Sequence, residues 1–293
     1  MATDLTQTGL AISGSTGAVG GRVASRMAGL GHAQRLIVRD ASRAPDLLGA
    51  EVAEDSYEDP EAIHEALSGT LTFFMVSAGE TSDRVRRHIA AVDAAVEAGV
   101  ERIVYLSFLG AALDATFTFA RHHWQTEEHV RSTGLKYTFL RDSAYLDYVP
   151  ALAGTDGVIR GPAGEGRVGA VARDDVAEVA VAVLLGDGHD GRTYDVTGPE
   201  AITLRGAAEE LSRVSGRRVI YHPETLEEAY ASRASYGAPD WEVEGWVTTY
   251  TAIARGEMDV VSATVGELTG HPPMGLVEFL QKYPESYRHL LST

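Results

Sequence analysis

The sequence has no cysteine among its 293 residues. This absence excludes a disulfide framework, a thiol nucleophile, an iron–sulfur cluster and a cysteine-based zinc site. It is also typical of a reducing compartment, so we expect a cytoplasmic protein. Long apolar runs are missing as well. The first residues carry no targeting pattern, and stretches such as 176–185 fall far below the ~20 residues that a membrane span needs. We therefore expect no membrane association.

Basic residues are scarce, with 25 Lys and Arg against 42 Asp and Glu, which gives a formal net charge of −17. A surface this acidic repels phosphates, so we expect no nucleic-acid partner. Hydrophobic residues make up 44% of the chain, which is ample for a packed core and excludes a disordered acidic chain.

Short apolar segments alternate with amphipathic ones through the first half of the chain. The expected strands are residues 10–13, 35–38, 51–54, 71–76, 103–106 and 136–140. The expected helices are residues 19–30, 59–67, 82–98 and 118–132. In the third helix, the apolar stripe expected to face the sheet is Val85, Ile89, Val92 and Val96. This alternation predicts an α/β fold with a doubly wound parallel sheet covered on both faces.

The second half of the chain is less regular. Residues 154–169 are rich in glycine and read as a loop, whereas a helix at 174–185 and a strand at 193–196 are expected to return to the main sheet. From residue 199 onward the pattern is mainly helical, and only 218–221 reads as a strand. We therefore expect one domain of residues 1–145 with 170–198, and a smaller, mainly helical domain of residues 146–169 and 199–293.

A glycine-rich loop with the spacing G-x-x-G-x-x-G follows the first strand and opens the first helix. Its residues are Gly14, Ser15, Thr16, Gly17, Ala18, Val19 and Gly20. Glycines let the backbone approach a pyrophosphate closely, the helix N-terminus supplies N–H groups, and the two hydroxyls can add donors. A turn without a ligand also needs glycine, but the strand before and the helix after favour a dinucleotide site.

The end of the second strand bears on the choice of dinucleotide. Arg39 follows the strand directly and Arg43 lies four residues on, so both can meet the 2′-phosphate of NADP(H), and Ser42 can donate to the same phosphate. The alternative is that both arginines are solvated surface charges. Because Asp40 can bind a ribose hydroxyl, NAD(H) stays possible, but NADP(H) is preferred.

Three further strand ends are expected at the same edge of the sheet, where ligands bind in folds of this kind. Ordinary turn residues are the alternative in each case. The candidate cofactor residues are Val76, Ser77 and Ala78 after the fourth strand, Ser107 after the fifth, and Asp55 with Ser56 after the third. Phe108 and Leu109 are the substrate candidates beside Ser107.

In chain order, these segments resemble the atypical short-chain dehydrogenase/reductase group, in particular the NmrA-like proteins and NAD(P)H:quinone oxidoreductases. The matching segments are residues 14–20, 38–43, 59–67, 98–111, 123–127, 137–141, 171–177 and 194–199, spread over about two-thirds of the chain. The resemblance implies a Rossmann-type NAD(P)-binding domain, a smaller C-terminal substrate domain and a cleft between them.

The resemblance also shows a departure in the catalytic pattern. Reductases of this superfamily use a Tyr-x-x-x-Lys pair, in which the tyrosine protonates the substrate carbonyl, together with a serine that Ser107 matches here. In this sequence Phe119 replaces the tyrosine and His123 replaces the lysine. His123 is therefore the first candidate for an acid near the nicotinamide or for a contact with the ribose. The alternative is a surface histidine paired with Glu127 on the next helical turn.

Two tyrosines follow the sixth strand where the family places substrate and nicotinamide contacts. Tyr145 can stack on a planar ring or donate a hydrogen bond, and Tyr148 is a second substrate candidate. Packing between the domains is the alternative for both.

Three functions follow from this reading. The leading one is an NADP(H)-dependent oxidoreductase that transfers a hydride to a small quinone or related conjugated aromatic. The second is an NmrA-like sensor of NAD(P) that acts through a protein partner without turnover. The third is a tailoring enzyme of secondary metabolism, performing reduction, oxygenation or coupling on an aromatic polyketide. We expect no metal, and a monomer or homodimer.

Overall fold

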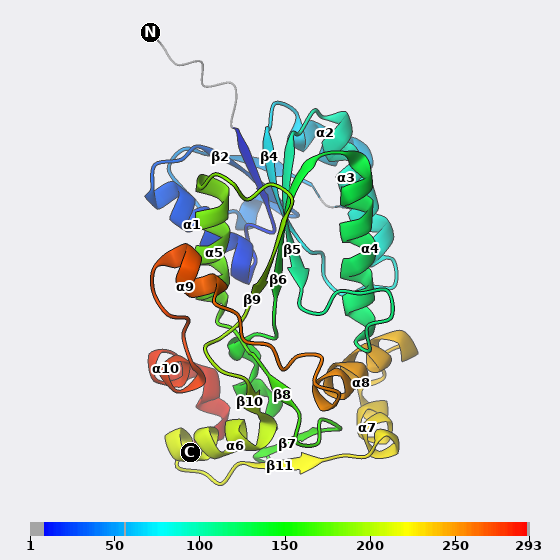
Figure 1. Ribbon diagram of the computed structural model, residues 1–293, viewed down its shortest axis with the longest axis vertical. Coiled ribbons are helices and arrows are strands. Elements are labelled where there is room, and N and C mark those ends of the chain that lie inside the picture. Colours follow the sequence, from blue (N-terminus) through cyan, green and yellow to red (C-terminus); the bar gives the residue numbers. More distant parts are fainter. Residues whose placement is uncertain (1–8, 56, 292–293) are drawn as a thin grey trace. The chain divides into compact units, whose positions relative to one another are not determined.

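The computed structural model describes residues 9–55 and 57–291 (Figure 1). The chain divides into two compact units. The first comprises the chain up to Phe108 together with His122–Arg141 and Val176–Tyr194, and the second comprises Leu109–Arg121, Asp142–Asp175 and the chain from Asp195 onward.

The first unit is built around a seven-stranded sheet with the strand order β3-β2-β1-β4-β5-β6-β9. The strands are β1 (Leu10–Ser13), β2 (Gln34–Val38), β3 (Ala50–Glu54), β4 (Thr72–Val76), β5 (Arg102–Phe108), β6 (Lys136–Asp142) and β9 (Arg192–Val196). β1 pairs in parallel with β2 and β4, so that Ile12 lies opposite both Leu36 and Phe74. This strand order is that of the Rossmann fold, and the fold class expected from the sequence is confirmed.

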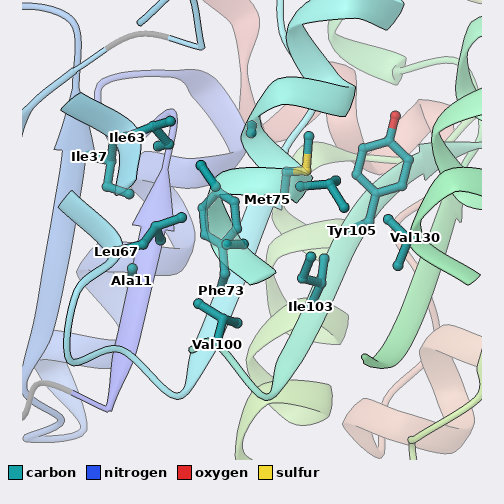
Figure 2. Packing of buried hydrophobic residues seen from close by; sticks show 14 of the residues in the cluster. Ala11, Ile37, Ile63, Leu67, Phe73, Met75, Val100, Ile103, Tyr105 and Val130 are labelled. Carbon is teal, nitrogen blue, oxygen red and sulfur yellow. The ribbon is translucent and has the colours of Figure 1, made fainter. Parts of the chain in front are cut away.

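Helices cover both faces of this sheet. They are α1 (Ala18–Gly29), α2 (Pro60–Leu67), α3 (Arg84–Glu97), α4 (Thr118–Thr133) and α5 (Arg173–Leu185). Figure 1 shows α1 and α5 on one face and α3 and α4 on the other. Because side chains alternate along a strand, Phe73 and Met75 point to the face of α3, where they pack with Ile103 and Leu67 in a fully buried cluster (Figure 2).

Local sequence signals explain where helix α2 begins. The Asp59 carboxylate accepts hydrogen bonds from the backbone N–H groups of Glu61 and Ala62 at 3.1 and 3.2 Å. Pro60 occupies the first helical position, where its missing N–H costs nothing because that group has no partner in a helix.

The second unit contains two small sheets and several helices. The strands are β7 (Val158–Gly161), β8 (Arg167–Val168), β10 (Ile202–Thr203) and β11 (Ile220–Pro223). The helices are α6 (Leu204–Ser215), α7 (Leu226–Arg233), α8 (Asp240–Ala254), α9 (Thr264–Thr269) and α10 (Leu276–Lys282). β7 pairs with β11 in parallel, and β8 pairs with β10 in antiparallel.

These small sheets correct one expectation. Residues 154–169 were expected to form a loop, but they contain β7 and β8. Both strands are short, and their pairing partners lie far along the chain, so local periodicity gives no signal for them. Within the described part of the chain, no helix is both long and apolar enough to cross a membrane.

Candidate active site

The glycine loop connects β1 to α1. Gly14 has a left-handed backbone with a φ of 61°, and the Gly17 N–H donates to the Gly14 carbonyl at 2.8 Å. Gly17 is the N-cap of α1 and offers no side chain to the first N–H groups, and the first turn has no acidic residue. A Cβ atom at position 20 would lie 2.4 Å from the Gly14 carbonyl oxygen, so only glycine permits this approach of helix and strand. The loop therefore presents backbone N–H groups and a positive helix end to an anion.

The side chains of the loop differ in exposure. Ser15 is buried, and its hydroxyl donates to the Ile12 carbonyl at 2.7 Å. In this structure that proton ties the loop to the end of β1, and a contact of Ser15 with the cofactor stays a prediction. Thr16 and Ala18 are exposed, whereas Val19 is buried in the core.

The end of β2 carries the two candidate arginines. The Asp40 carboxylate caps the short 3₁₀ helix η1 (Ala41–Arg43), accepting from the Ser42 hydroxyl at 2.6 Å and the Ser42 N–H at 3.0 Å. These two bonds, the hydroxyl first, lower the pKa of Asp40. The Ser42 proton is therefore engaged by Asp40 and not free for a phosphate, whereas Arg39 and Arg43 extend from the same turn as exposed side chains.

Ser13 and Tyr57 join the ends of β1 and β4, an arrangement that the sequence did not reveal. The Tyr57 hydroxyl lies 2.5 Å from the Ser13 hydroxyl and 2.9 Å from the Val76 carbonyl, and the Val76 N–H donates to Ser13 at 2.9 Å. Burial raises the pKa of Tyr57 far above its ordinary value, so this phenol stays protonated. Asp55 is buried at the end of β3, and Ser56 lies outside the described residues.

Helix α3 buries two charged or titratable residues. The predicted apolar stripe of this helix was therefore partly wrong. Arg84 and His88 are buried with Ala91, Val92 and Ala95, whereas Val96 is 41% exposed. The helix is therefore rotated relative to the expectation. Polar side chains can face inward here because other buried groups form hydrogen bonds with them. The spacing of apolar residues along the sequence does not reveal such hydrogen bonds.

His88 ties the end of β4 to helix α4. The Ala78 N–H donates to His88 Nε2 at 2.9 Å, so this nitrogen is unprotonated and the ring proton is on Nδ1. Nδ1 then donates to the Thr126 hydroxyl at 2.9 Å, and that hydroxyl donates to the His122 carbonyl. Burial, aided by the charge of Arg84, keeps the pKa of His88 well below 6.5. The neutral ring thus positions Ala78, a candidate cofactor residue.

His123 is buried in the same network. Arg84 Nη2 lies 3.1 Å from His123 Nε2, and because a guanidinium only donates, His123 must accept there. Its proton is therefore on Nδ1, 2.9 Å from the Tyr105 hydroxyl. Burial first and the Arg84 charge second hold the pKa of His123 well below 6.5. Both ring nitrogens are engaged, and the alternative pairing of His123 with Glu127 is wrong. Figure 2 shows the Tyr105 hydroxyl pointing away from the apolar cluster.

We predict that the two buried histidines make stability depend on pH. Their folded-state pKa values lie below 6.5, so below that pH the unfolded chain binds protons that the folded chain does not. The free energy of unfolding should fall with decreasing pH, by up to about 1.4 kcal/mol per pH unit for each histidine, between about pH 7 and about pH 5. Urea denaturation at several pH values measures this slope. His88→Gln, whose amide can accept from Ala78 and donate to Thr126, should lower it; an unchanged slope contradicts the prediction.

Glu127 is fully buried and receives several donors. The Ser107 hydroxyl donates to it at 2.7 Å, and Arg141 forms a two-point ion pair with it at 2.8 and 2.6 Å. Arg131 adds a further contact at 3.1 Å. Ser107, the expected strand-end serine, is only 1% exposed, and its hydroxyl proton is donated to Glu127.

Phe119 occupies the position of the usual tyrosine, and it is a packing residue. Its ring lies 5.5 Å from that of Phe117 and 6.1 Å from that of Trp241 within the second unit. At Gly245 a Cβ atom would lie only 2.4 Å from the Phe119 ring, so a glycine on α8 makes room for it. Phe119 is 2% exposed and has no proton to donate.

Tyr145 and Tyr148 belong to the second unit. The Tyr145 hydroxyl donates to the Asp142 carboxylate, and the Arg173 guanidinium lies 4.6 and 4.5 Å from the centres of the Tyr145 and Tyr148 rings. Burial, followed by the Asp142 charge, raises the pKa of Tyr145 well above its ordinary value. The Tyr145 proton is thus engaged, whereas Tyr148 is 57% exposed.

The chain is similar to known NAD(P)H-binding proteins. A sequence profile of NAD(P)H-binding proteins matches residues 14–187, beginning at the first glycine of the loop. The chain belongs to this NAD(P)H-binding family. The cofactor class expected from the sequence, NAD(P)H, is therefore confirmed.

Individual relatives can be aligned with nearly the whole length of this chain. The (4-alkanoyl-5-oxo-2,5-dihydrofuran-3-yl)methyl phosphate reductase of Streptomyces griseus is 35% identical, over 94% of this chain and 98% of the relative. Quinone oxidoreductase 2 of Escherichia coli is 32% identical, over 92% and 96%. The crystal structure of the NADPH-dependent quinone oxidoreductase QOR2 of Escherichia coli with NADPH superimposes with a TM-score of 0.85 at 31% identity, over 93% of this chain and 99% of that one. The predicted resemblance to this group is confirmed.

Proposed function

We propose that the protein is an NADP(H)-dependent oxidoreductase that transfers a hydride to a quinone or a related conjugated aromatic. The observation that carries this proposal is the loss of the usual acid. Phe119 is buried and apolar where the reductase tyrosine is expected, and His123 uses both ring nitrogens inside the protein. Substrates that need strong protonation of a carbonyl are therefore disfavoured, whereas a quinone accepts a hydride readily.

The residues at the strand ends fit the cofactor. The loop from Gly14 to Gly20 would hold the pyrophosphate on backbone N–H groups, since a Cβ atom at its third glycine would collide with the loop itself. Arg39 and Arg43 would receive the 2′-phosphate, and Val76, Ser77 and Ala78 would line the same edge. His88 would keep Ala78 in place through its hydrogen bond.

The chemistry requires little of the protein beyond alignment. When bound, NADPH supplies a hydride, which carries two electrons and one proton to the quinone, and water supplies the second proton of the hydroquinone. Phe108, half-buried and 6.0 Å from the His123 ring, is proposed as a contact for a flat substrate. Tyr148, which is 57% exposed in the second unit, stays a substrate candidate from the sequence. Of the expected catalytic residues, His123 and Ser107 are proposed to position this edge and not to donate protons to the substrate.

The substrate class is also supported by the relatives. Quinone oxidoreductase 2 of Escherichia coli, which the QOR2 crystal structure also represents, is named for a quinone, and the Streptomyces griseus relative is named for a conjugated lactone that carries a phosphate. Both relatives are thus named as enzymes that act on conjugated compounds.

The proposed function is tested by following the oxidation of NADPH with a matched pair of acceptors. Naphthoquinone should be reduced, whereas cyclohexanone should not, because its reduction creates an alkoxide that needs an acid. Tight NADPH binding without oxidation by any quinone would overturn the proposal and favour the sensor.

We predict that Arg39→Ala weakens the binding of NADPH more than the binding of NADH. Only NADPH carries the 2′-phosphate, and a charge-assisted hydrogen bond contributes about 1.5–3 kcal/mol, so the ratio of the two dissociation constants should change at least about tenfold. Calorimetric titration with both nucleotides measures this ratio. Arg192→Ala, which removes an exposed arginine at the opposite end of the sheet, is the control and should leave it unchanged. Equal weakening of both nucleotides contradicts the assignment.

A further inference from the structure

Arg84 carries a buried positive charge that no carboxylate among the described residues pairs with. The residue is 5% exposed, and its buried Nε has no hydrogen-bond partner. Within residues 9–55 and 57–291, the only side-chain hydrogen bond of its guanidinium goes to His123, which is neutral. A buried charge without a counter-charge is costly, and proteins rarely retain one for packing alone.

Within the described ranges, no acidic side chain forms an ion pair or a hydrogen bond with the Arg84 guanidinium. His88 and His123 are both neutral, and their pKa values are lowered partly because Arg84 is close. The nearest acidic residue along the chain, Asp83, accepts hydrogen bonds from Arg87 first, then from Thr81 and Arg86, and these lower its pKa to about 2. Arg84 is also the first residue of α3, whose positive end adds to its charge.

The position of Arg84 connects it with the ligand edge of the sheet. It begins the helix that follows the carboxyl end of β4, the edge at which the glycine loop lies. Its neighbour His123 packs against Phe108 at the end of β5, and His88, one turn along α3, holds Ala78 at the end of β4. The unpaired charge is therefore built into the network that borders the proposed site.

We propose that Arg84 receives an oxygen anion of the substrate. This inference rests on the proposed function and specifies its substrate class. The anion is either a permanent acidic substituent, such as a sulfonate or carboxylate, or the oxyanion left on a quinone after hydride addition. Both have the same chemistry, and a guanidinium binds either with charge-assisted hydrogen bonds.

A merely structural role for Arg84 makes a different prediction. If the residue served only to hold His123, its removal would destabilise the fold. If it serves a ligand, Arg84→Met removes an uncompensated charge, and the free protein should be at least as stable to heat as the wild type. Arg86→Met is the matched control, because Arg86 lies on the same helix with its side chain 68% exposed.

The experiment compares naphthoquinone with its sulfonate derivative in the wild type, Arg84→Met, Arg84→Lys and Arg86→Met. A permanent substituent predicts that Arg84→Met raises KM for the sulfonate at least about tenfold and leaves the neutral quinone unchanged. A developing oxyanion predicts an equal loss of kcat for both quinones, of about tenfold or more. In either case Arg84→Lys should recover part of the loss, and Arg86→Met should behave as the wild type.

Other results overturn the inference. Unchanged kinetics in Arg84→Met, or a loss confined to NADPH affinity, excludes a role toward the substrate. If the wild type reduces neither quinone, the proposed function fails, and the anion site is then tested by calorimetry with naphthalene sulfonate on the NADP⁺-bound protein. Binding that is lost in Arg84→Met supports the site, whereas absent binding or binding independent of Arg84 overturns it.

Discussion

Gly20→Ala should abolish most NADPH binding and destabilise the first unit. The new Cβ atom would lie 2.4 Å from the Gly14 carbonyl oxygen and 2.7 Å from that of Ser13. Both neighbours are backbone atoms and cannot rotate away, so α1 must move off β1 at the point where the loop turns. Overpacking of this kind costs about 1–3 kcal/mol of stability. If the displaced loop loses two of its proposed backbone hydrogen bonds to the phosphates, at about 1.5–3 kcal/mol each, the dissociation constant of NADPH should rise by about a hundredfold or more.

The chain offers a matched control on the same helix. Gly29, at the end of α1, has open space around the position of a Cβ atom and no left-handed backbone. Gly29→Ala should therefore keep NADPH affinity and raise stability by about 0.4–1 kcal/mol, because alanine restricts the unfolded chain. Nucleotide titration and urea denaturation of both variants measure the two effects. Wild-type NADPH affinity in Gly20→Ala would show that the close contact is not needed for binding.

The sequence predicted those parts of the site that depend on local spacing. The glycine loop, the cap at Asp59 and the alternation of strands and helices each leave a signal within a few residues, and the structure has them at the predicted places. The family match confirms the cofactor class, whereas the loop's contact with it stays a prediction. Arg39 and Arg43 follow from the same reasoning, because the residue after the second strand has a fixed place in such folds.

The buried polar network could not be predicted in this way. Arg84 pairs with a residue 39 positions away and Tyr57 with one 44 positions away, so no local pattern records these contacts. A count of apolar residues assigned α3 an apolar stripe that contains neither Arg84 nor His88, although both are buried. The same limit applies to Tyr145, whose proton is engaged by Asp142, because sequence spacing does not show which hydroxyls already have acceptors.

These hydrogen bonds change the chemical roles that the candidate residues can have. Ser107, His123 and Tyr145 were expected as catalytic groups, and each has its proton held by another protein atom. Within the first unit, Ser107 and His123 therefore link strand β5 to helix α4 instead of offering a free proton. Rigid positioning is what hydride transfer to an easily reduced ring requires, since it depends on alignment more than on acid catalysis.

Glu127→Ala should cause a large loss of stability. The Glu127 side chain is fully buried and accepts from Ser107 and from both ends of the Arg141 guanidinium. Its removal takes away the ion pair that Glu127 makes with Arg141, whose side chain is 21% exposed. Breaking a buried ion pair by removing one partner costs about 3–5 kcal/mol, whereas an exposed pair contributes about 0–1 kcal/mol.

Glu128→Ala provides the control for that variant, because Glu128 is the next residue on α4, is 48% exposed and pairs with Arg131 at the surface. Urea denaturation of both variants should show a loss below about 1 kcal/mol for Glu128→Ala and several times more for Glu127→Ala. A third variant separates charge from shape. Glu127→Gln keeps an acceptor for Ser107 but removes the charge that balances Arg141, so it should recover only part of the loss. Equal stability of Glu127→Gln and the wild type would show that hydrogen bonding, and not charge, holds Arg141 in place.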